Sequence, residues 1–334
     1  MDPQLRIEKR PSASGDKYYL VKDIRVGKKG TKVSRLIKTG SPPTPEEEYA
    51  AKETHGPDIL EQAVNKYGEL RSQTLKYAYI PKSIGREIEK IRYIHKILQD
   101  TLTSHELEEY EKNSEYQYVH GTTSIEGNTL DLRETKQLLN DNIAPDNKLL
   151  REINEVQNFR LVKKYRDASK KPVTIEFILK IHQLIMTNID IEMAGVFRRS
   201  NAIGIVGYDG LLPPADIIEE SLQGIIDEYY RKVSEGYCPF EQAVLFHHRF
   251  ECIHPFNDGN GRTGREIFNY LLIRDKFPRM FFISENFRKQ YLDALNRGDK
   301  ENYAGMVALF ASMIIKQHKN VMERMVEQTT QKPQ

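Results

Sequence analysis

The chain has 334 residues, of which 39% are hydrophobic and 29% charged, and its formal net charge is +2. This is the composition of a globular protein with one large or two modest domains, and the charge gives no global reason to expect nucleic-acid binding. Two cysteines exclude a disulfide framework, and the sequence has neither a signal-peptide core nor a run of roughly 20 apolar residues, which predicts a cytoplasmic protein with no membrane partner.

The first predicted element is a basic β-hairpin over residues 17–38. Two alternating, β-branched-rich runs flank the turn Gly27-Lys28-Lys29-Gly30. The segment carries eight Lys or Arg residues and one Asp, so it could contact nucleic acid or an acidic partner. We favour the simpler interpretation, a solvated edge ribbon whose lysines oppose aggregation. A Pro-rich linker follows, and residues 1–42 are treated as one β-hairpin extension.

Residues 43–170 are predicted to form a helical N-terminal region. Apolar residues recur at helical spacing from Ile84 to Leu98. Thr103 and Glu106 then occupy capping-box positions of a polar helix that runs toward Glu126 and breaks at Gly127. Further amphipathic helices follow in "LREINEVQNFRLVKKY" and "TIEFILKIHQLIM". The chain is therefore expected to be mainly α.

A short β-type run interrupts the helical pattern before Pro213-Pro214, where the next helix is expected to begin. From spacing alone, a plain connecting loop and a flap that holds a peptide by strand addition are equally good interpretations. The residues of this run are Ala202, Ile203, Gly204, Ile205 and Val206.

The stretch "HPFNDGNGRTGR", residues 254–265, combines a potential base, a carboxylate that can bind a hard metal ion, and glycines and arginines that can bind an anion. Apolar periodicity predicts buried helices on both sides, and Pro255 ends the first one directly after His254. Glycines at the start of the second helix let backbone N–H groups face an anion, while Arg262 and Arg265 lie on one side of its first turn. With Asp258 as a magnesium ligand, the loop predicts phosphoryl or nucleotidyl transfer.

Zinc chemistry is disfavoured by the same stretch. His248, Glu251 and His254 are each three residues apart, which is not the usual helical zinc spacing, and no cysteine pair supports them. A metal-hydrolase interpretation is therefore set aside, and His247 and His248 are interpreted as packing or surface residues.

The loop resembles the signature of the Fic family, His-x-Phe-x-Asp/Glu-Gly-Asn-Gly-Arg-x-x-Arg, at every fixed position. The resemblance extends over roughly residues 85–315 and implies a Fic-type helical bundle with a β-hairpin flap, preceded here by the small N-terminal β-hairpin. It implies transfer of AMP from ATP to a Ser, Thr or Tyr hydroxyl of a protein, with residues 171–315 as the catalytic core and 316–334 as a polar tail.

The resemblance also implies a role for each signature residue. His254 would deprotonate the hydroxyl, and Asp258 would hold Mg²⁺. The phosphates would be bound by Gly259, Asn260, Gly261, Arg262 and Arg265. Tyr291 and Asn296 are candidates for the adenine pocket, and residues 202–206 would form the flap.

A second family pattern, Ser/Thr-x-x-x-Glu-Gly/Asn, is met by Thr122, Glu126 and Gly127. In such proteins the glutamate pairs with the last signature arginine, here Arg265, and competes with the γ-phosphate of ATP. The expectation is an autoinhibited enzyme. The same glutamate could instead position water for removal of AMP.

Other functions stay open at this point. The transferred group could be phosphoryl or UMP, although the intact loop favours AMP. A different class of function is a nucleotide-sensing or DNA-binding adaptor that uses the basic hairpin. A non-catalytic remnant is disfavoured because no signature residue is missing. The expected partners are ATP and a protein substrate, including the protein itself, and relatives often form homodimers.

Overall fold

The structure is a computed structural model that describes residues 5–169, 171–201, 212–282 and 285–330; for 285–287 and 319–330 it describes the backbone alone. The predicted flap strand, 202–206, lies outside the described residues. The chain divides into two compact units: unit 1 has residues 1–76, 81–108 and 314–334, and unit 2 has residues 77–80 and 109–313. Within the described residues there are eleven α-helices and three strands, so the prediction of a mainly α protein is confirmed.

Unit 1 contains an antiparallel sheet in the order β1-β2-β3, formed by β1 (Arg6–Arg10), β2 (Lys17–Val26) and β3 (Lys29–Thr39). The predicted hairpin is confirmed as β2 and β3, with Val26 opposite Lys29 and Gly27 in the turn at a φ of 59°. Strand β1 was not predicted. It is short and mostly charged, and pairing with β2 rather than its own pattern makes it a strand.

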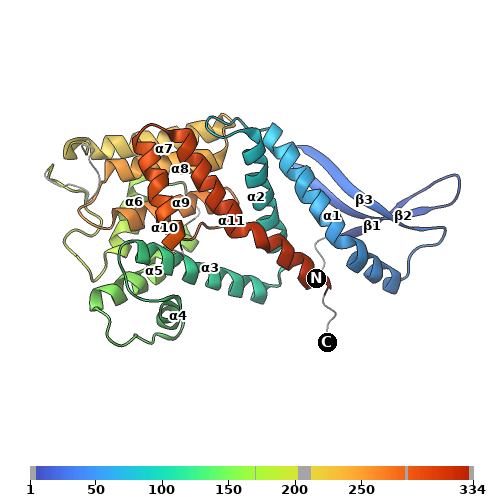
Figure 1. Cartoon of the computed structure of the whole chain (residues 1–334), viewed down its shortest axis with the longest axis horizontal. Coiled ribbons are helices and arrows are strands. Elements are labelled where there is room, and N and C mark those ends of the chain that lie inside the picture. Colours follow the sequence, from blue (N-terminus) through green and yellow to red (C-terminus); the bar gives the residue numbers. More distant parts are fainter. Residues whose placement is uncertain (1–4, 170, 202–211, 283–284, 331–334) are drawn as a thin grey trace. The chain divides into compact units, whose positions relative to one another are not determined.

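Helix α1 (Pro45–Gln73) packs against this sheet and against α2 (Lys82–Thr101) (Figure 1). A capping box between Thr44 and Glu47 begins α1 directly after the Pro-rich linker. Ile59, Ala63 and Val64 form its buried stripe, and Leu20 on β2 is fully buried as well. In the apolar stripe predicted from Ile84 to Leu98, the residues from Ile88 onward form the buried side of α2, and Ile84 is partly exposed.

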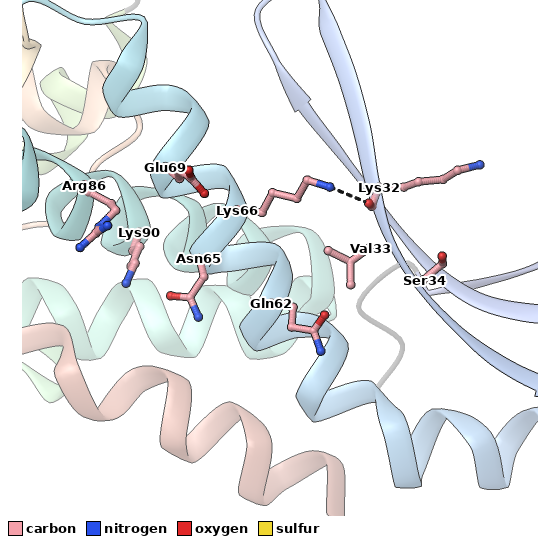
Figure 2. Close-up of a pocket in the computed structure, with 9 residues that line it drawn as sticks. All are labelled: Lys32, Val33, Ser34, Gln62, Asn65, Lys66, Glu69, Arg86 and Lys90. Carbon is pink, nitrogen blue, oxygen red and sulfur yellow. Dashed lines mark hydrogen bonds between the residues drawn. The ribbon is translucent and has the colours of Figure 1, made fainter.

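A groove of about 730 Å³ opens in unit 1 beside β3, α1 and α2 (Figure 2). Four cationic side chains line it, but several are already neutralised. Lys32 points away from α1 and bonds to Glu8 at 2.8 Å, and Lys90 pairs with Glu87 at 2.9 Å. Lys66 donates to the backbone carbonyl of Lys32 at 3.1 Å. The two ion pairs reduce the positive charge that the sequence alone offers to a polyanion, whereas Lys66 bonds to a neutral carbonyl and keeps its charge.

Unit 2 is a helical assembly around two central helices, α8 (Pro239–Ile253) and α9 (Asn260–Arg274) (Figure 1). In each of them 12 of 15 residues are buried, which confirms that two core helices bracket the 254–265 loop. The surrounding elements are α3 (Ser104–Ile125), α4 (Leu132–Asp141), α5 (Leu150–Ala168), α6 (Ile175–Ile185), η1 (Ala215–Ile217), α7 (Ile218–Ser234), α10 (Glu285–Asp299) and α11 (Tyr303–Thr330). The boundary between the units falls within α3 and α11, and α11 continues to Thr330 through the expected polar tail.

Buried ion pairs connect α9 to α3 and α5. Arg166 is 4% exposed and contacts Glu115 at 2.7 Å and Glu266 at 3.0 Å, while Arg279 contacts Glu115 at 3.1 Å. Removing one member would leave a buried charge without its partner, at a cost of about 3–5 kcal/mol. Glu266 therefore holds the first half of α9 in one position relative to α3 and α5.

Helix α8 is anchored at its other end by a buried carboxylate. Glu241 accepts backbone N–H groups from Ala78, Tyr79 and Ile80 at 2.9, 3.0 and 2.9 Å. Its side chain is fully buried. Within the described residues, none of the helices combines the length and the apolar character needed to cross a membrane.

Candidate active site

His254 occupies the left-handed position that ends α8, with φ 48° and ψ 62°. Its backbone N–H bonds to Phe250 at 3.0 Å, and Pro255 prevents the helix from continuing. This backbone conformation is uncommon for a residue with a side chain, and the fold keeps it through several backbone contacts. The imidazole is therefore attached to a rigid helix end.

Arg198 fixes this helix end from the other side, and the sequence analysis missed it. It is 2% exposed, and its Nε donates to the backbone carbonyl of His254 at 2.8 Å. The same guanidinium donates to the carbonyls of Pro213 at 2.6 Å and Ser200 at 3.2 Å. Arg198 thus joins His254 to both ends of the segment predicted as a flap. The only sequence signal was an arginine pair before that segment.

The environment of His254 keeps its imidazole neutral. Burial and, to a smaller extent, the charge of Arg198 lower its pKa to about 4, while the backbone of Glu251 opposes the shift. A neutral imidazole can accept a proton at pH 7. This is the protonation state that a general base requires.

The loop closes on itself before α9 begins. Asn260 accepts the backbone N–H of Phe256 at 2.9 Å and donates to its carbonyl at 2.8 Å. Gly259 has a φ of 75°, and a Cβ there would lie 2.9 Å from the sulfur of Met186, so a side chain does not fit. The first N–H groups of α9 have no acceptor within the helix and lie at the positive end of its dipole. The start of α9 therefore has the N–H donors and the positive partial charge that suit an anion.

A second buried histidine, His182 on α6, supports this loop and was also missed by the sequence analysis. The backbone N–H of Gly195 donates to its Nδ1 at 2.9 Å, which leaves a proton on Nε2 to donate to the carbonyl of Asp258 at 2.9 Å. Its ring stacks on Phe256 at 3.6 Å. Burial lowers its pKa to about 4, so the neutral form that makes both bonds persists at pH 7.

Asp258 lies in a network of charged side chains. Its two carboxylate oxygens contact Arg151 on α5 at 2.5 Å and Arg262 at 3.1 Å. Arg262 is 2% exposed and also lies 3.1 Å from Glu155. Arg151 is 56% exposed, so one side of Asp258 is covered by a side chain at the surface.

Arg265 is bound to the helix that carries the second motif. Its Nε donates to Oγ1 of Thr122 at 2.8 Å, and its Nη2 donates to the Thr122 carbonyl at 2.8 Å and to Glu126 at 2.6 Å. A Cβ built on Gly261 would collide with the Glu126 carboxylate. Glu126 therefore lies directly over Gly261 in the first turn of α9, and Gly127 follows it at a φ of 95°.

The two adenine candidates lie in different environments. Tyr291 is 2% exposed, its hydroxyl lies 3.0 Å from Nε2 of His247, and its ring lies 5.7 Å from the Arg265 guanidinium. In this conformation the ring supports Arg265 from the core and has almost no surface open to a ligand. Asn296 is exposed on α10.

Comparisons with known proteins agree on the type of fold. Residues 172–272 match the family model described as the Fic/DOC family. Proteins named "Protein adenylyltransferase Fic" from Drosophila willistoni and Aedes aegypti are 32% and 30% identical to this chain over 203 and 213 residues. These alignments cover 59% and 62% of this chain, and 40% and 42% of the relatives, so the chain spans less than half of their length.

Solved structures show the same fold. Fic-1 (residues 134–508) from C. elegans matches with a TM-score of 0.65 and 22% identity, over 86% of this chain and 90% of that one. A Fic-domain signalling protein from Bacteroides thetaiotaomicron matches with a TM-score of 0.63 and 22% identity, over 74% of this chain and all of that one. The expected Fic-type helical fold is confirmed, and residues 172–272 form a domain of the Fic/DOC family.

Proposed function

We propose that this protein transfers AMP from ATP to a hydroxyl group of a protein substrate, with residues 254–265 as its catalytic loop. One observation carries the proposal. The neutral imidazole of His254 lies at a rigid helix end, six residues before the start of α9. The first turns of α9 combine N–H groups that have no acceptor within the helix with two buried arginines. The name that the curated relatives carry, protein adenylyltransferase, agrees with this chemistry.

In the proposed reaction the hydroxyl oxygen attacks the α-phosphorus of ATP, and pyrophosphate leaves. The hydroxyl proton moves to the imidazole of His254, which is why the neutral state of this residue matters. The N–H groups at Gly259, Asn260 and Gly261 would bind the phosphates, and the Gly259 N–H would first have to leave Oδ1 of Asp258, to which it donates at 2.5 Å. Since the Asn260 side chain already bonds to Phe256, we assign its contribution to the backbone and to the shape of the loop.

Arg262 and Arg265 would bind the β- and γ-phosphates. Both side chains are held by carboxylates, and a phosphate would have to replace these partners. Because the arginines are almost completely buried, their interaction with phosphate would be only weakly screened by solvent.

Asp258 would hold Mg²⁺, and the residues fit this ion. Carboxylate oxygens are preferred ligands of Mg²⁺, and the Asp258 side chain is 43% exposed. The oxygen bound to Arg151 could be released by movement of a surface side chain. When bound, Mg²⁺ would supply positive charge to the phosphate groups of ATP.

We further propose that Glu126 holds the enzyme in an autoinhibited state. Its carboxylate pairs with Arg265 at 2.6 Å and takes the space above Gly261, where a phosphate of ATP would lie. The arrangement is intramolecular, since both groups belong to one chain. Thr122 supports this inhibitory contact, because its hydroxyl oxygen accepts a hydrogen bond from Nε of Arg265.

The test uses the full chain and ATP labelled at either the α- or the γ-phosphate. Label from the α-position should enter protein with Glu126→Gly, weakly with wild type, and not with Glu126→Gly combined with His254→Ala. Transfer of γ-label alone would instead show a phosphoryl transferase. Release of AMP from previously labelled protein, dependent on Glu126, would show the reverse reaction.

A further inference from the structure

Three potential metal ligands meet on α8 and α10, away from the catalytic loop residues described above. His248 and Cys252 are one helical turn apart on α8, and Asp299 ends α10. The Nε2 of His248 lies 2.9 Å from Oδ1 of Asp299 and 3.5 Å from Sγ of Cys252. The sulfur lies 3.8 Å from the same Asp299 oxygen. The potential ligand atoms of one imidazole, one thiol and one carboxylate therefore lie within 4.8 Å of one another.

These distances are close to the edges of a tetrahedral zinc site. With Zn–S of about 2.3 Å and Zn–N or Zn–O of about 2.0–2.1 Å, tetrahedral angles give edges of about 3.6 Å to sulfur and about 3.4 Å between nitrogen and oxygen. The observed distances differ from these edges by about half an ångström between nitrogen and oxygen, and by about 0.2 Å or less to sulfur. A zinc ion could be accommodated by small side-chain rotations, without movement of either helix.

The packing around His248 fixes the position of its imidazole next to Asp299. His248 is 4% exposed, and a Cβ on Gly298 would lie 2.5 Å from its Nε2. Only a glycine at this position lets α10 approach closely enough to bring Asp299 to the imidazole. Asp299 and Cys252 remain partly exposed, which leaves a path for an ion and a fourth position for water.

The local pattern predicts a packing or surface role for His248 and disfavours zinc at His248, Glu251 and His254. The structure brings together a different set. Its first two members have a helical i, i+4 spacing, but the third is 47 residues beyond Cys252, and nothing in the local pattern marks it.

We propose that His248, Cys252 and Asp299 bind Zn²⁺ through Nε2, Sγ and Oδ1, with water as the fourth ligand. The combination of thiolate, imidazole and carboxylate suits this borderline-soft ion, whereas Mg²⁺ prefers oxygen ligands alone. Binding replaces the thiol proton by the metal, so one proton is released, and His248 coordinates as the neutral tautomer that carries its proton on Nδ1. The ion would link the last turn of α8, two residues before His254, to the end of α10. This site is independent of the function proposed above.

The test is metal binding to the full-length chain after treatment with a chelator and its removal. Co²⁺, which takes the same tetrahedral sites, serves as the optical probe, and Zn²⁺ affinity is measured by competition with a chromophoric chelator. Wild type should bind one Co²⁺ with a thiolate-to-cobalt charge-transfer band that Zn²⁺ abolishes. Cys252→Ser should lose this band, and Asp299→Asn should bind Zn²⁺ at least about tenfold more weakly.

Controls separate this site from other sources of the signal. Cys238→Ala removes the other cysteine and should keep the band, and Co²⁺ bound at Asp258 would give no thiolate band. Circular dichroism confirms that each variant folds; should Cys252→Ser fail to fold, the loss of affinity in Asp299→Asn decides. Absence of the band in wild type, its persistence in Cys252→Ser, or unchanged Zn²⁺ affinity in Asp299→Asn would each overturn the proposal.

Discussion

Replacing Glu126 measures how strongly the second motif opposes ATP. Arg265 is 1% exposed, but the Glu126 side chain is 36% exposed, so solvent screens their pair. A hydrogen bond to a charged group contributes about 1.5–3 kcal/mol, and partial exposure places this one near the lower limit. ATP must displace this bond, so its loss should strengthen ATP binding by about 1.4 kcal/mol, or roughly tenfold.

Two substitutions separate charge from space. Glu126→Gln keeps a side chain above Gly261 and removes the charge, whereas Glu126→Gly removes both. Binding of ATP with Mg²⁺, measured by isothermal titration calorimetry, should therefore improve in the order wild type, Gln, Gly. Glu109→Gln, an exposed position earlier on α3, is the matched control and should behave as wild type. The autoinhibition hypothesis is wrong if Glu126→Gly and wild type bind ATP within about twofold of each other.

Four other predictions concern the base, its support and the anchor of α8. In the Glu126→Gly background, Arg198→Lys should lower kcat about tenfold or more with little change in KM for ATP. The lysine side chain is shorter and has a single ammonium group, so it cannot reach all the carbonyls that position His254. An equal rise in KM would contradict this role. AMP transfer should stay constant from pH 8 to pH 5 and decline only near the His254 pKa of about 4, and a decline centred at pH 6.5 would show an unperturbed histidine. The free energy of unfolding should nevertheless decrease as the pH falls from about 6.5 to 4, as urea titrations at each pH can measure. Burial lowers the pKa of His254, His182 and His247, so the unfolded chain takes up protons that these folded histidines do not; Glu251, whose pKa burial raises to about 7, opposes the decrease only in part. Glu241→Gln should lower the free energy of unfolding by about 2–4 kcal/mol, because an amide oxygen cannot replace a carboxylate that accepts three N–H groups, and unchanged denaturation curves would refute that role.

The hairpin and the amphipathic helices could be predicted because their signals are local. Gly27 in the turn of β2 and β3, the capping box at Thr44 and the apolar stripe of α2 all act within a few residues of chain. Strand β1 could not be predicted, because a short charged segment becomes a strand only when a partner edge is available.

The candidate site divides in the same way. His254, Asp258 and the two arginines lie within twelve residues, so their order alone indicates the chemistry. Arg198 and His182 are 56 and 76 residues from the loop atoms that they hold, and each is an ordinary residue in its own helix or loop. Their roles follow from burial and from specific carbonyl acceptors, neither of which a local pattern encodes.

The sequence by itself determined which reactive groups stand on one short turn, because proline and glycine set the backbone of that turn locally. The tertiary structure decided their state: burial keeps His254 neutral, and a helix 139 residues earlier places Glu126 against Arg265. It also decided that His248 and Cys252 meet Asp299. Charge, solvation and pairing depend on every group within a few ångströms, and most of those groups come from distant parts of the chain.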